Sequence, residues 1–88
     1  LLQNYPNPFN PETVIGFQIP EANNVTIKIF NSIGQEVRTL LDMQYDEGIH
    51  SVIWDGKDNL GKSLSSGVYF YRLQAGTYNQ VKKMSLLR

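Results

Sequence analysis

The sequence predicts an all-β fold, a β-sandwich of six or seven short antiparallel strands. Short apolar runs alternate with polar residues at period two, and clusters of Gly, Pro, Asn and Asp interrupt them about every ten residues. The 88 residues, 41% of them hydrophobic, suffice for one domain with a small core. No apolar run approaches the ~20 residues that a membrane helix requires. We therefore expect one small soluble domain.

The predicted domain opens with an Asn/Pro-rich lead segment, residues 1–12. Each proline fixes φ, lacks an N–H donor and keeps the residue before it out of the helical region. We expect an extended, polyproline-like segment that is neither helix nor strand, with Tyr5 and Phe9 available to anchor it on the core. The sandwich itself is expected to span residues 13–88. The motif in the lead segment reads Asn4-Tyr5-Pro6-Asn7-Pro8-Phe9-Asn10-Pro11.

Three strands are expected in the first half of the sandwich. Residues 14–18 form the first, which ends before Pro20. Residues 25–29 alternate cleanly and form the second, with Val25, Ile27 and Ile29 on its buried face. A turn at residues 31–34 leads to a third strand at 36–41, and a polar loop then runs to Gly48.

The third strand has a competing interpretation. Residues 36–47 lack Gly and Pro, and taken alone they fit a short amphipathic helix, since apolar side chains recur at helical spacing. The strand is preferred because its neighbours are strands and because periodicity does not resolve short apolar runs. The residues at helical spacing are Val37, Leu40, Leu41 and Gln44.

The second half is predicted to hold another strand and a terminal hairpin. Residues 50–55 place Val52 and Trp54 on one face, and a tight polar loop follows at 55–61. Strands at 68–75 and 80–87 are expected to pair across a turn at residues 76–79.

The net charge of zero hides an asymmetry along the chain. Residues 1–66 hold four basic and all eight acidic residues, a net charge of −4, whereas residues 67–88 hold four basic residues and no acid. This excess is too small to indicate nucleic-acid binding, so we expect no nucleic-acid partner. Two interpretations stay open, a solvated strand with acidic neighbours and a distinct face for an acidic partner. The four cations are Arg72, Lys82, Lys83 and Arg88.

No pattern in the chain indicates catalysis. There is no cysteine, which excludes disulfide staples and cysteine-ligated zinc. His50, the only histidine, lies on an alternating strand, where a structural role is the usual one. Nucleophile-elbow, phosphate-loop and zinc-protease motifs are missing. No two acidic residues are spaced so that their carboxylates would be buried together, as general acid catalysis requires. We therefore expect no enzyme and no cofactor.

Two further hypotheses concern binding. Asp55, Asp58 and Asn59 crowd one loop and offer oxygen ligands for calcium, without the spacing of an EF-hand. Such residues more often bond their own backbone, so the expected metal is none. A carbohydrate-binding face would need exposed aromatic residues, whereas packing in the core is the alternative. The candidates for such a face are Trp54, Tyr69, Phe70, Tyr71 and Tyr78.

Taken in order, these segments resemble a known family. The whole chain resembles the type A C-terminal sorting domain of the type IX secretion system, most specifically in the octet that runs from Asn4 to Pro11. Residues 29–73 are also similar to the Ig-like domain of flagellar hook-capping proteins. The residues that carry the resemblance are the octet, Gly34, the Trp54-Asp55-Gly56 triplet, Gly67, Tyr69 and the terminal Lys83-Met84-x-Leu86-Leu87.

The resemblance implies an Ig-like antiparallel β-sandwich at the C-terminus of an exported protein. In that family an N-terminal passenger domain of the same precursor reaches the periplasm by a separate signal. An outer-membrane translocon and a shuttle protein then recognise the sorting domain. A sortase often removes the domain, and the passenger ends on the cell surface or outside the cell. Because this chain does not begin with Met, we expect it to be part of such a longer precursor.

The last strand is the candidate recognition site. An edge strand offers unpaired N–H and C=O groups for strand addition, and Lys82 and Lys83 would keep that edge soluble. The set comprises Lys82, Lys83, Met84, Leu86, Leu87 and Arg88, with Met84, Leu86 and Leu87 as apolar anchors. Alternatively these residues complete the sandwich. The competing function is a non-catalytic Ig-like structural or carbohydrate-binding accessory module of a secreted hydrolase.

Overall fold

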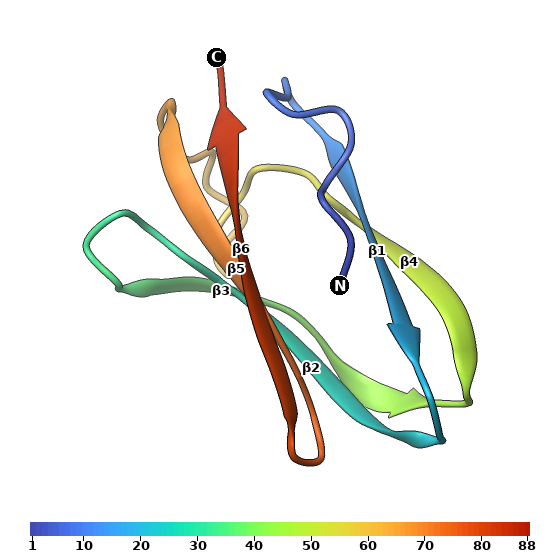
Figure 1. Cartoon of the computed structure of the whole chain (residues 1–88). Coiled ribbons are helices and arrows are strands. Elements are labelled where there is room, and N and C mark those ends of the chain that lie inside the picture. Colours follow the sequence, from blue (N-terminus) through green and yellow to red (C-terminus); the bar gives the residue numbers. More distant parts are fainter.

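Six antiparallel strands form two facing sheets. The computed structural model describes residues 1–88 (Figure 1). The small sheet pairs β1 (Thr13–Ile19) with β4 (Gly48–Trp54). The large sheet has the order β3 (Glu36–Tyr45), β2 (Asn23–Phe30), β5 (Gly67–Ala75) and β6 (Tyr78–Leu86). The predicted all-β sandwich is confirmed, with six strands where six or seven were expected. The structure contains no helix with the length and apolar character needed to cross a bilayer.

The core fills the space between the two sheets. Alternate residues of β1, β2 and β5 point inward, as the period of two in the sequence requires. The predicted inward side chains of Val25, Ile27 and Ile29 are fully buried. Fifteen hydrophobic residues form one buried cluster, to which the small sheet, the large sheet and the lead segment all contribute. The largest fully buried side chains are Trp54, Tyr71, Phe9 and Phe17.

The segment that also fits a helix is a strand throughout. β3 continues to Tyr45 rather than ending at Leu41, because Met43 and Tyr45 keep pairing with Val25 and Asn23 of β2. The polar loop predicted before Gly48 therefore shrinks to two residues, 46 and 47. The register of β2 with β3 shifts twice, and each shift inserts one extra residue into β3.

The terminal hairpin is tighter than predicted. Ala75 pairs with Tyr78, so the turn consists of Gly76 and Thr77 alone, and Gly76 has a positive φ of 60°. β6 begins at Tyr78 rather than at Gln80 and ends at Leu86. It is an edge strand of the large sheet, but the backbone groups that the recognition hypothesis assumed to be unpaired are bonded by the lead segment from Lys83 O to Leu87 N.

The lead segment contains neither helix nor strand, as predicted, but it is not extended. Its backbone bends at residues 6–8 and again at 10–11. The anchoring role expected for Tyr5 is wrong, since its side chain is 78% exposed. The role expected for Phe9 is confirmed at 2% exposure. The second buried residue of the lead segment is Asn4. Its side-chain amide is satisfied in the interior, because Nδ2 donates to Pro6 O and to Thr13 Oγ1.

Candidate functional site

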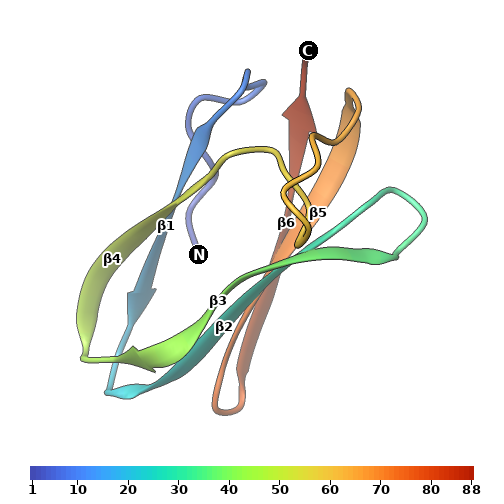
Figure 2. The same ribbon diagram turned by 180° about the vertical axis from the view of Figure 1, so that it is seen from behind.

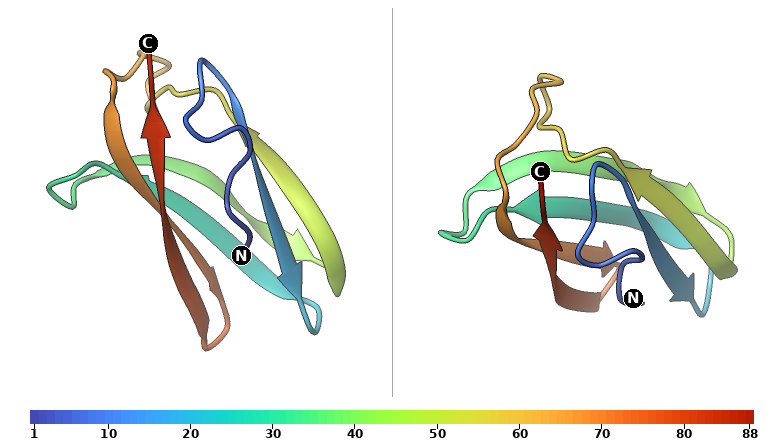
Figure 3. Two further views of the ribbon diagram at one scale, coloured as in Figure 1. Left: turned by 45° about the horizontal axis from the view of Figure 1, so that its top comes forward. Right: turned by 90° about the horizontal axis from the view of Figure 1, so that it is seen from above.

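The lead segment closes the side of the sandwich between β1 and β6 (Figure 3). On β1, Tyr5 N donates to Val14 O at 2.9 Å and Val14 N donates back to Tyr5 O at 2.8 Å. On β6, Phe9 N donates to Ser85 O at 3.0 Å, and Leu87 N donates to Phe9 O at 2.9 Å. These bonds give the free edges of both sheets a common partner. The Asn/Pro motif is therefore a structural part of the domain and lies against its last strand.

Side chains of the lead segment extend this cover along β6. Asn7 Oδ1 accepts from Ser85 N at 3.0 Å, and Gln3 Nε2 donates to Lys83 O at 2.8 Å. The outward backbone groups of β6 are thus bonded from Lys83 O to Leu87 N. The prolines suit this position because each one removes an N–H that would otherwise need a partner.

A buried polar network holds the start of the segment. Asn4 N donates to Tyr71 Oη at 2.9 Å, and Tyr71 Oη donates to Leu2 O at 2.8 Å. Asn4 Nδ2 donates to Thr13 Oγ1 at 3.0 Å, and this hydroxyl donates to Pro6 O at 2.9 Å. No buried side-chain nitrogen or oxygen lacks a partner. Sequence reasoning missed Thr13, and it considered Tyr71 only as an aromatic ring, because this network joins residues far apart in the chain.

Replacing Tyr71 by phenylalanine tests this network. The change leaves the Asn4 N–H and the Leu2 carbonyl without their partner, which should lower the free energy of unfolding by about 2 kcal/mol. Urea denaturation at pH 7 measures the effect. An unchanged midpoint would show that the network does not hold the lead segment.

The same variant has an expected pH dependence. Burial raises the pKa of Tyr71 above the ordinary tyrosine value of 10.0, although the bond from Asn4 N–H acts in the opposite direction. The folded state therefore holds this proton more tightly than the unfolded state does. Its contribution is complete below pH 10 and is lost as the pH rises through the folded-state pKa. The wild type should lose more stability than Tyr71→Phe in that window, and equal losses would contradict the assignment.

Phe9 is the main apolar anchor of the lead segment. Its ring centroid lies 5.6 Å from that of Trp54, and Trp54 lies 5.6 Å from Tyr69 in an edge-to-face contact. Trp54 Nε1 donates to Lys57 O at 3.0 Å, and Tyr69 Oη donates to Ser65 O at 2.7 Å. Two of the aromatic residues considered for carbohydrate binding are thus core residues, and Tyr71 is a third. Phe70 and Tyr78 remain partly exposed.

The six residues of the candidate recognition site do not form one surface. Met84 and Leu86 are buried in the core, so they complete the sandwich and are not exposed anchors. Leu87 is the one apolar residue of the set that remains exposed. Lys82 and Lys83 are consecutive on β6 and therefore point to opposite faces of the sheet.

The Arg88 side chain folds back over the loop that follows β4. Arg88 Nη2 donates to Gly56 O at 2.9 Å, and its Nε donates to Leu64 O. A Cβ at Gly56 would lie 2.8 Å from Arg88 Nη2 and 3.1 Å from Pro11 O, and φ at Gly56 is +75°. The triplet Trp54-Asp55-Gly56 thus needs glycine last, because the chain end and the lead segment both approach it there.

The basic residues of the last hairpin are dispersed. The Arg72 guanidinium lies over the Phe30 ring, with Cζ 5.0 Å from the centroid. Arg88 bonds carbonyl groups of the loop. The predicted distinct basic face for an acidic partner is therefore wrong, because the two remaining cations, Lys82 and Lys83, point to opposite faces of the sheet.

The remaining motif residues lie at turns and strand ends. Gly34 is in the turn between β2 and β3, with φ of 86°, and Gly67 is the first residue of β5. Asn7 and Asn10 lie at the surface of the lead segment, as do Pro6, Pro8 and Pro11.

The calcium hypothesis has no support in the loop geometry. Asp55 Oδ1 lies 3.3 Å from Arg38 Nη1, and the same nitrogen donates to Lys57 O and Asp58 O. An arginine thus occupies the position that a cation would need. Asp58 Oδ1 accepts from two backbone N–H groups of its own loop, and Asn59 Oδ1 accepts from Thr39 N. No group of three or more acidic or histidine side chains could hold a metal ion.

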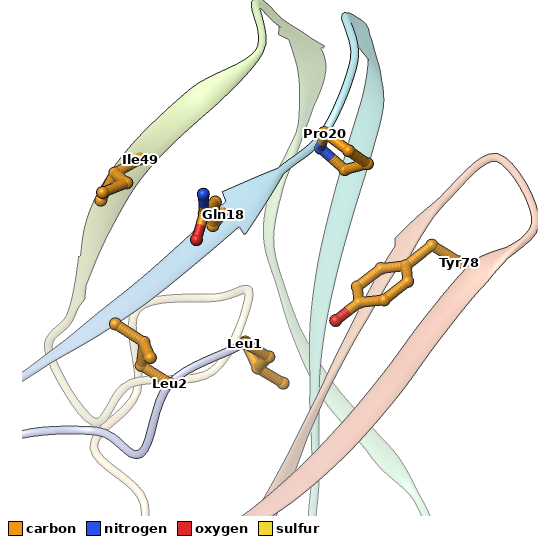
Figure 4. A pocket seen from close by; sticks show the side chains of 6 residues that line it. All are labelled: Leu1, Leu2, Gln18, Pro20, Ile49 and Tyr78. Atoms are coloured by element: carbon orange, nitrogen blue, oxygen red, sulfur yellow. The ribbon is translucent and has the colours of Figure 1, made fainter.

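Neither the only histidine nor the hollow beside the lead segment brings several reactive side chains together. The His50 Nε2 lies 2.7 Å from Asp46 O, and its ring packs against Phe17 and Tyr45. An open hollow of about 300 Å³ lies beside the start of the lead segment (Figure 4). Its walls are mostly apolar and carry no acid or base apart from a tyrosine. They are formed by Leu1, Leu2, Gln18, Pro20, Ile49 and Tyr78.

Known structures share this fold. A dimeric latent PorU from Porphyromonas gingivalis matches over 97% of this chain and 9% of its own, with a TM-score of 0.78 and 20% identity. PorZ of the same organism, described as an essential bacterial surface component of the type-IX secretion system, matches 98% of this chain and 11% of its own, with a TM-score of 0.68 and 19% identity. FlgD from P. aeruginosa matches 84% of this chain and 58% of its own, with a TM-score of 0.68 and 22% identity.

The chain thus spans less than two thirds of each of these proteins. No curated protein sequence matches it. A family model for the FlgD Ig-like domain matches residues 7–79, from the middle of the Asn/Pro motif to the beginning of β6. The chain therefore belongs to the FlgD Ig-like domain family.

Proposed function

We propose that this chain is a C-terminal sorting domain that directs an N-terminal passenger protein across the outer membrane through the type IX secretion system. It acts as the ligand of an outer-membrane translocon and shuttle, not as an enzyme. A sortase then removes it in many cases, and the passenger remains on the cell surface or outside the cell. The domain resides in the periplasm during transit.

One observation carries the proposal. The octet that gave the resemblance lies along the last strand, where Asn7 and Phe9 bond the backbone of Ser85 and Leu87. The opening motif and the terminal strand, the two segments that distinguish a sorting domain from other Ig-like modules, thus form one structural unit. The shared fold of PorZ, a component of the type-IX secretion system, supports the same function.

Recognition is proposed to use the exposed end of this unit. Lys83 and Leu87 lie on β6 and just beyond it, and both side chains are exposed. Met84 and Leu86 contribute indirectly, because they keep β6 in place from the core side. Truncation before these residues would remove part of the core, so it cannot separate recognition from folding.

Surface substitutions test recognition without that problem. A fluorescent protein with an inner-membrane export signal is fused to residues 1–88 in a host with a type IX system. Lys83→Glu with Leu87→Glu should reduce surface and medium fluorescence by about tenfold or more, because an exposed apolar contact and a charge are both lost. The matched control is Lys62→Glu with Ile33→Glu, which makes the same kind of change at two exposed positions in loops.

The control variant should be exported like the wild type. Circular dichroism of the purified domains verifies that both variants are folded. If the hairpin variant is folded and still exported normally, the proposed recognition surface is wrong. If the wild-type fusion itself stays in the periplasm, the sorting function is wrong.

The second candidate is a non-catalytic structural Ig-like module. The family model favours it, since its match ends at residue 79 and therefore does not require most of β6. In that case a type IX host would not secrete the fusion, with or without the substitutions at Lys83 and Leu87. The same assay thus separates the two functions.

A further inference from the structure

The sandwich has four edge strands, β1 and β4 in the small sheet and β3 and β6 in the large one. An edge strand exposes a row of unpaired N–H and C=O groups that can pair with another strand. Proteins usually protect such edges with covering segments, charged residues or bulges. The four edges of this domain differ in this respect.

Three edges carry a protective feature. The lead segment covers β1 and the part of β6 from Lys83 onward, and Lys82 lies next to the covered part. β3 has two register shifts, and Asn59 bonds its edge at Val37 O and Thr39 N. These features make pairing with another strand unfavourable at each of the three edges.

β4 has none of these features. Its sequence from Gly48 to Trp54 contains no Asp, Glu, Lys, Arg or Pro. Its register with β1 runs without a shift from Gly48 to Trp54, so no bulge twists it away. Figure 2 shows β4 at the outer edge of the molecule, with β3 diverging from it beyond the connecting turn. β4 pairs with β1 alone.

The bonds of β1 indicate which groups of β4 are free. Val14 and Gly16 turn their backbone groups toward the lead segment and therefore away from β4. In an antiparallel pair, the residues opposite them also turn outward. These are Ile53 and Ser51, and the same alternation includes Ile49. The side chains of Ile49 and Ile53 are 75% and 58% exposed.

We propose that the β4 edge pairs with the β4 edge of a second copy of this chain, antiparallel about a two-fold axis at Ser51. In this register the pattern Ile-x-Ser-x-Ile pairs with an identical copy of itself. Ile49 of each copy lies opposite Ile53 of the other, and the two Ser51 residues lie opposite each other. A two-fold interface requires such self-complementarity. The strand carries no formal charge, so like charges do not oppose each other. The result is a continuous sheet of the order β1-β4-β4-β1.

Charge substitutions at the two isoleucines test the register. Ile49→Lys with Ile53→Lys places lysines opposite each other, and we expect the dissociation constant of the dimer to rise about tenfold or more. Ile49→Lys with Ile53→Glu is the matched variant, because each lysine then lies opposite a glutamate of the other copy. We expect this variant to dimerise. Both positions are exposed, so the fold should tolerate both changes.

Sedimentation equilibrium up to about millimolar concentration measures the dimer, because a single strand pair gives a small and weak interface. The wild type and the Lys/Glu variant should approach twice 10.0 kDa, and the Lys/Lys variant should remain at 10.0 kDa. Amide exchange of Ile49, Ser51 and Ile53 should slow as the wild type dimerises. A wild type that stays monomeric, a dimer insensitive to the Lys/Lys change, or a Lys/Glu variant that fails to dimerise would each overturn the proposal.

Discussion

Replacing Phe9 by alanine should lower the free energy of unfolding by about 3–5 kcal/mol, a large part of the total stability of a domain this size. Phe9 is buried against Trp54, so the truncation leaves a cavity between the lead segment and the core. The same residue bonds Ser85 and Leu87 through its backbone. Loosening it should therefore expose the edge of β6 as well.

Tyr5→Ala is the matched control, because it removes an aromatic residue of the same motif whose side chain is exposed. Its cost should stay within about 0.5 kcal/mol, as for other surface substitutions. Urea denaturation monitored by Trp54 fluorescence compares the two, and amide exchange at Leu87 reports whether the edge opens. Equal and small costs for both variants would show that the lead segment does not stabilise the sandwich.

The lead segment shows where sequence reasoning reaches its limit. Three prolines exclude a helix and a regular strand from local chemistry alone, and that prediction is confirmed. Local chemistry does not decide which side chain faces the core. Asn4 is buried because Tyr71 and Thr13 offer it partners, and both belong to later parts of the chain. Tyr5 and Phe9 carry similar aromatic signals, and only the docked geometry separates them.

The extent of β3 and its bulges were not predicted, for a different reason. A regular strand alternates inside and outside at period two, but a bulge shifts this alternation by one residue. Leu41 pairs with Ile27 and Thr39 pairs with Lys28, so Leu40 is an extra residue. Because of the extra residue, the neighbouring Leu40 and Leu41 both contact the core, and with Val37 they give the sequence an apparent helical spacing. The fold class was predictable from the regular strands, and the bulges were not.

The sequence identified the segment that holds the candidate recognition residues, but it did not show which of their side chains share a surface. The alternation along β6 could have assigned Met84 and Leu86 to the core. These two apolar residues are two positions apart, and the polar residues Lys83 and Ser85 occupy the alternate positions. The position of Arg88 was not accessible in this way, because its partners are carbonyl groups of a loop, 24 and 32 residues earlier in the chain. Charge counted along a sequence therefore overestimates the charge that one face presents.

Two adjacent leucines allow stability and recognition to be separated. Leu86 is fully buried, and Leu86→Ala should cost about 2–5 kcal/mol through the lost transfer free energy and the cavity. Leu87 is 55% exposed, and Leu87→Ala should cost no more than about 0.5 kcal/mol. Thermal denaturation of the two variants measures this difference.

In the export assay, the two variants should then fail for different reasons if the sorting function holds. Leu86→Ala should yield a partly unfolded domain whose export recovers at lower temperature, where the domain is more stable. Leu87→Ala should yield a folded domain whose export stays reduced at every temperature. If Leu87→Ala is exported normally while Leu86→Ala is not, β6 serves the fold alone. The terminal hairpin would then be required for export only because the sandwich requires it.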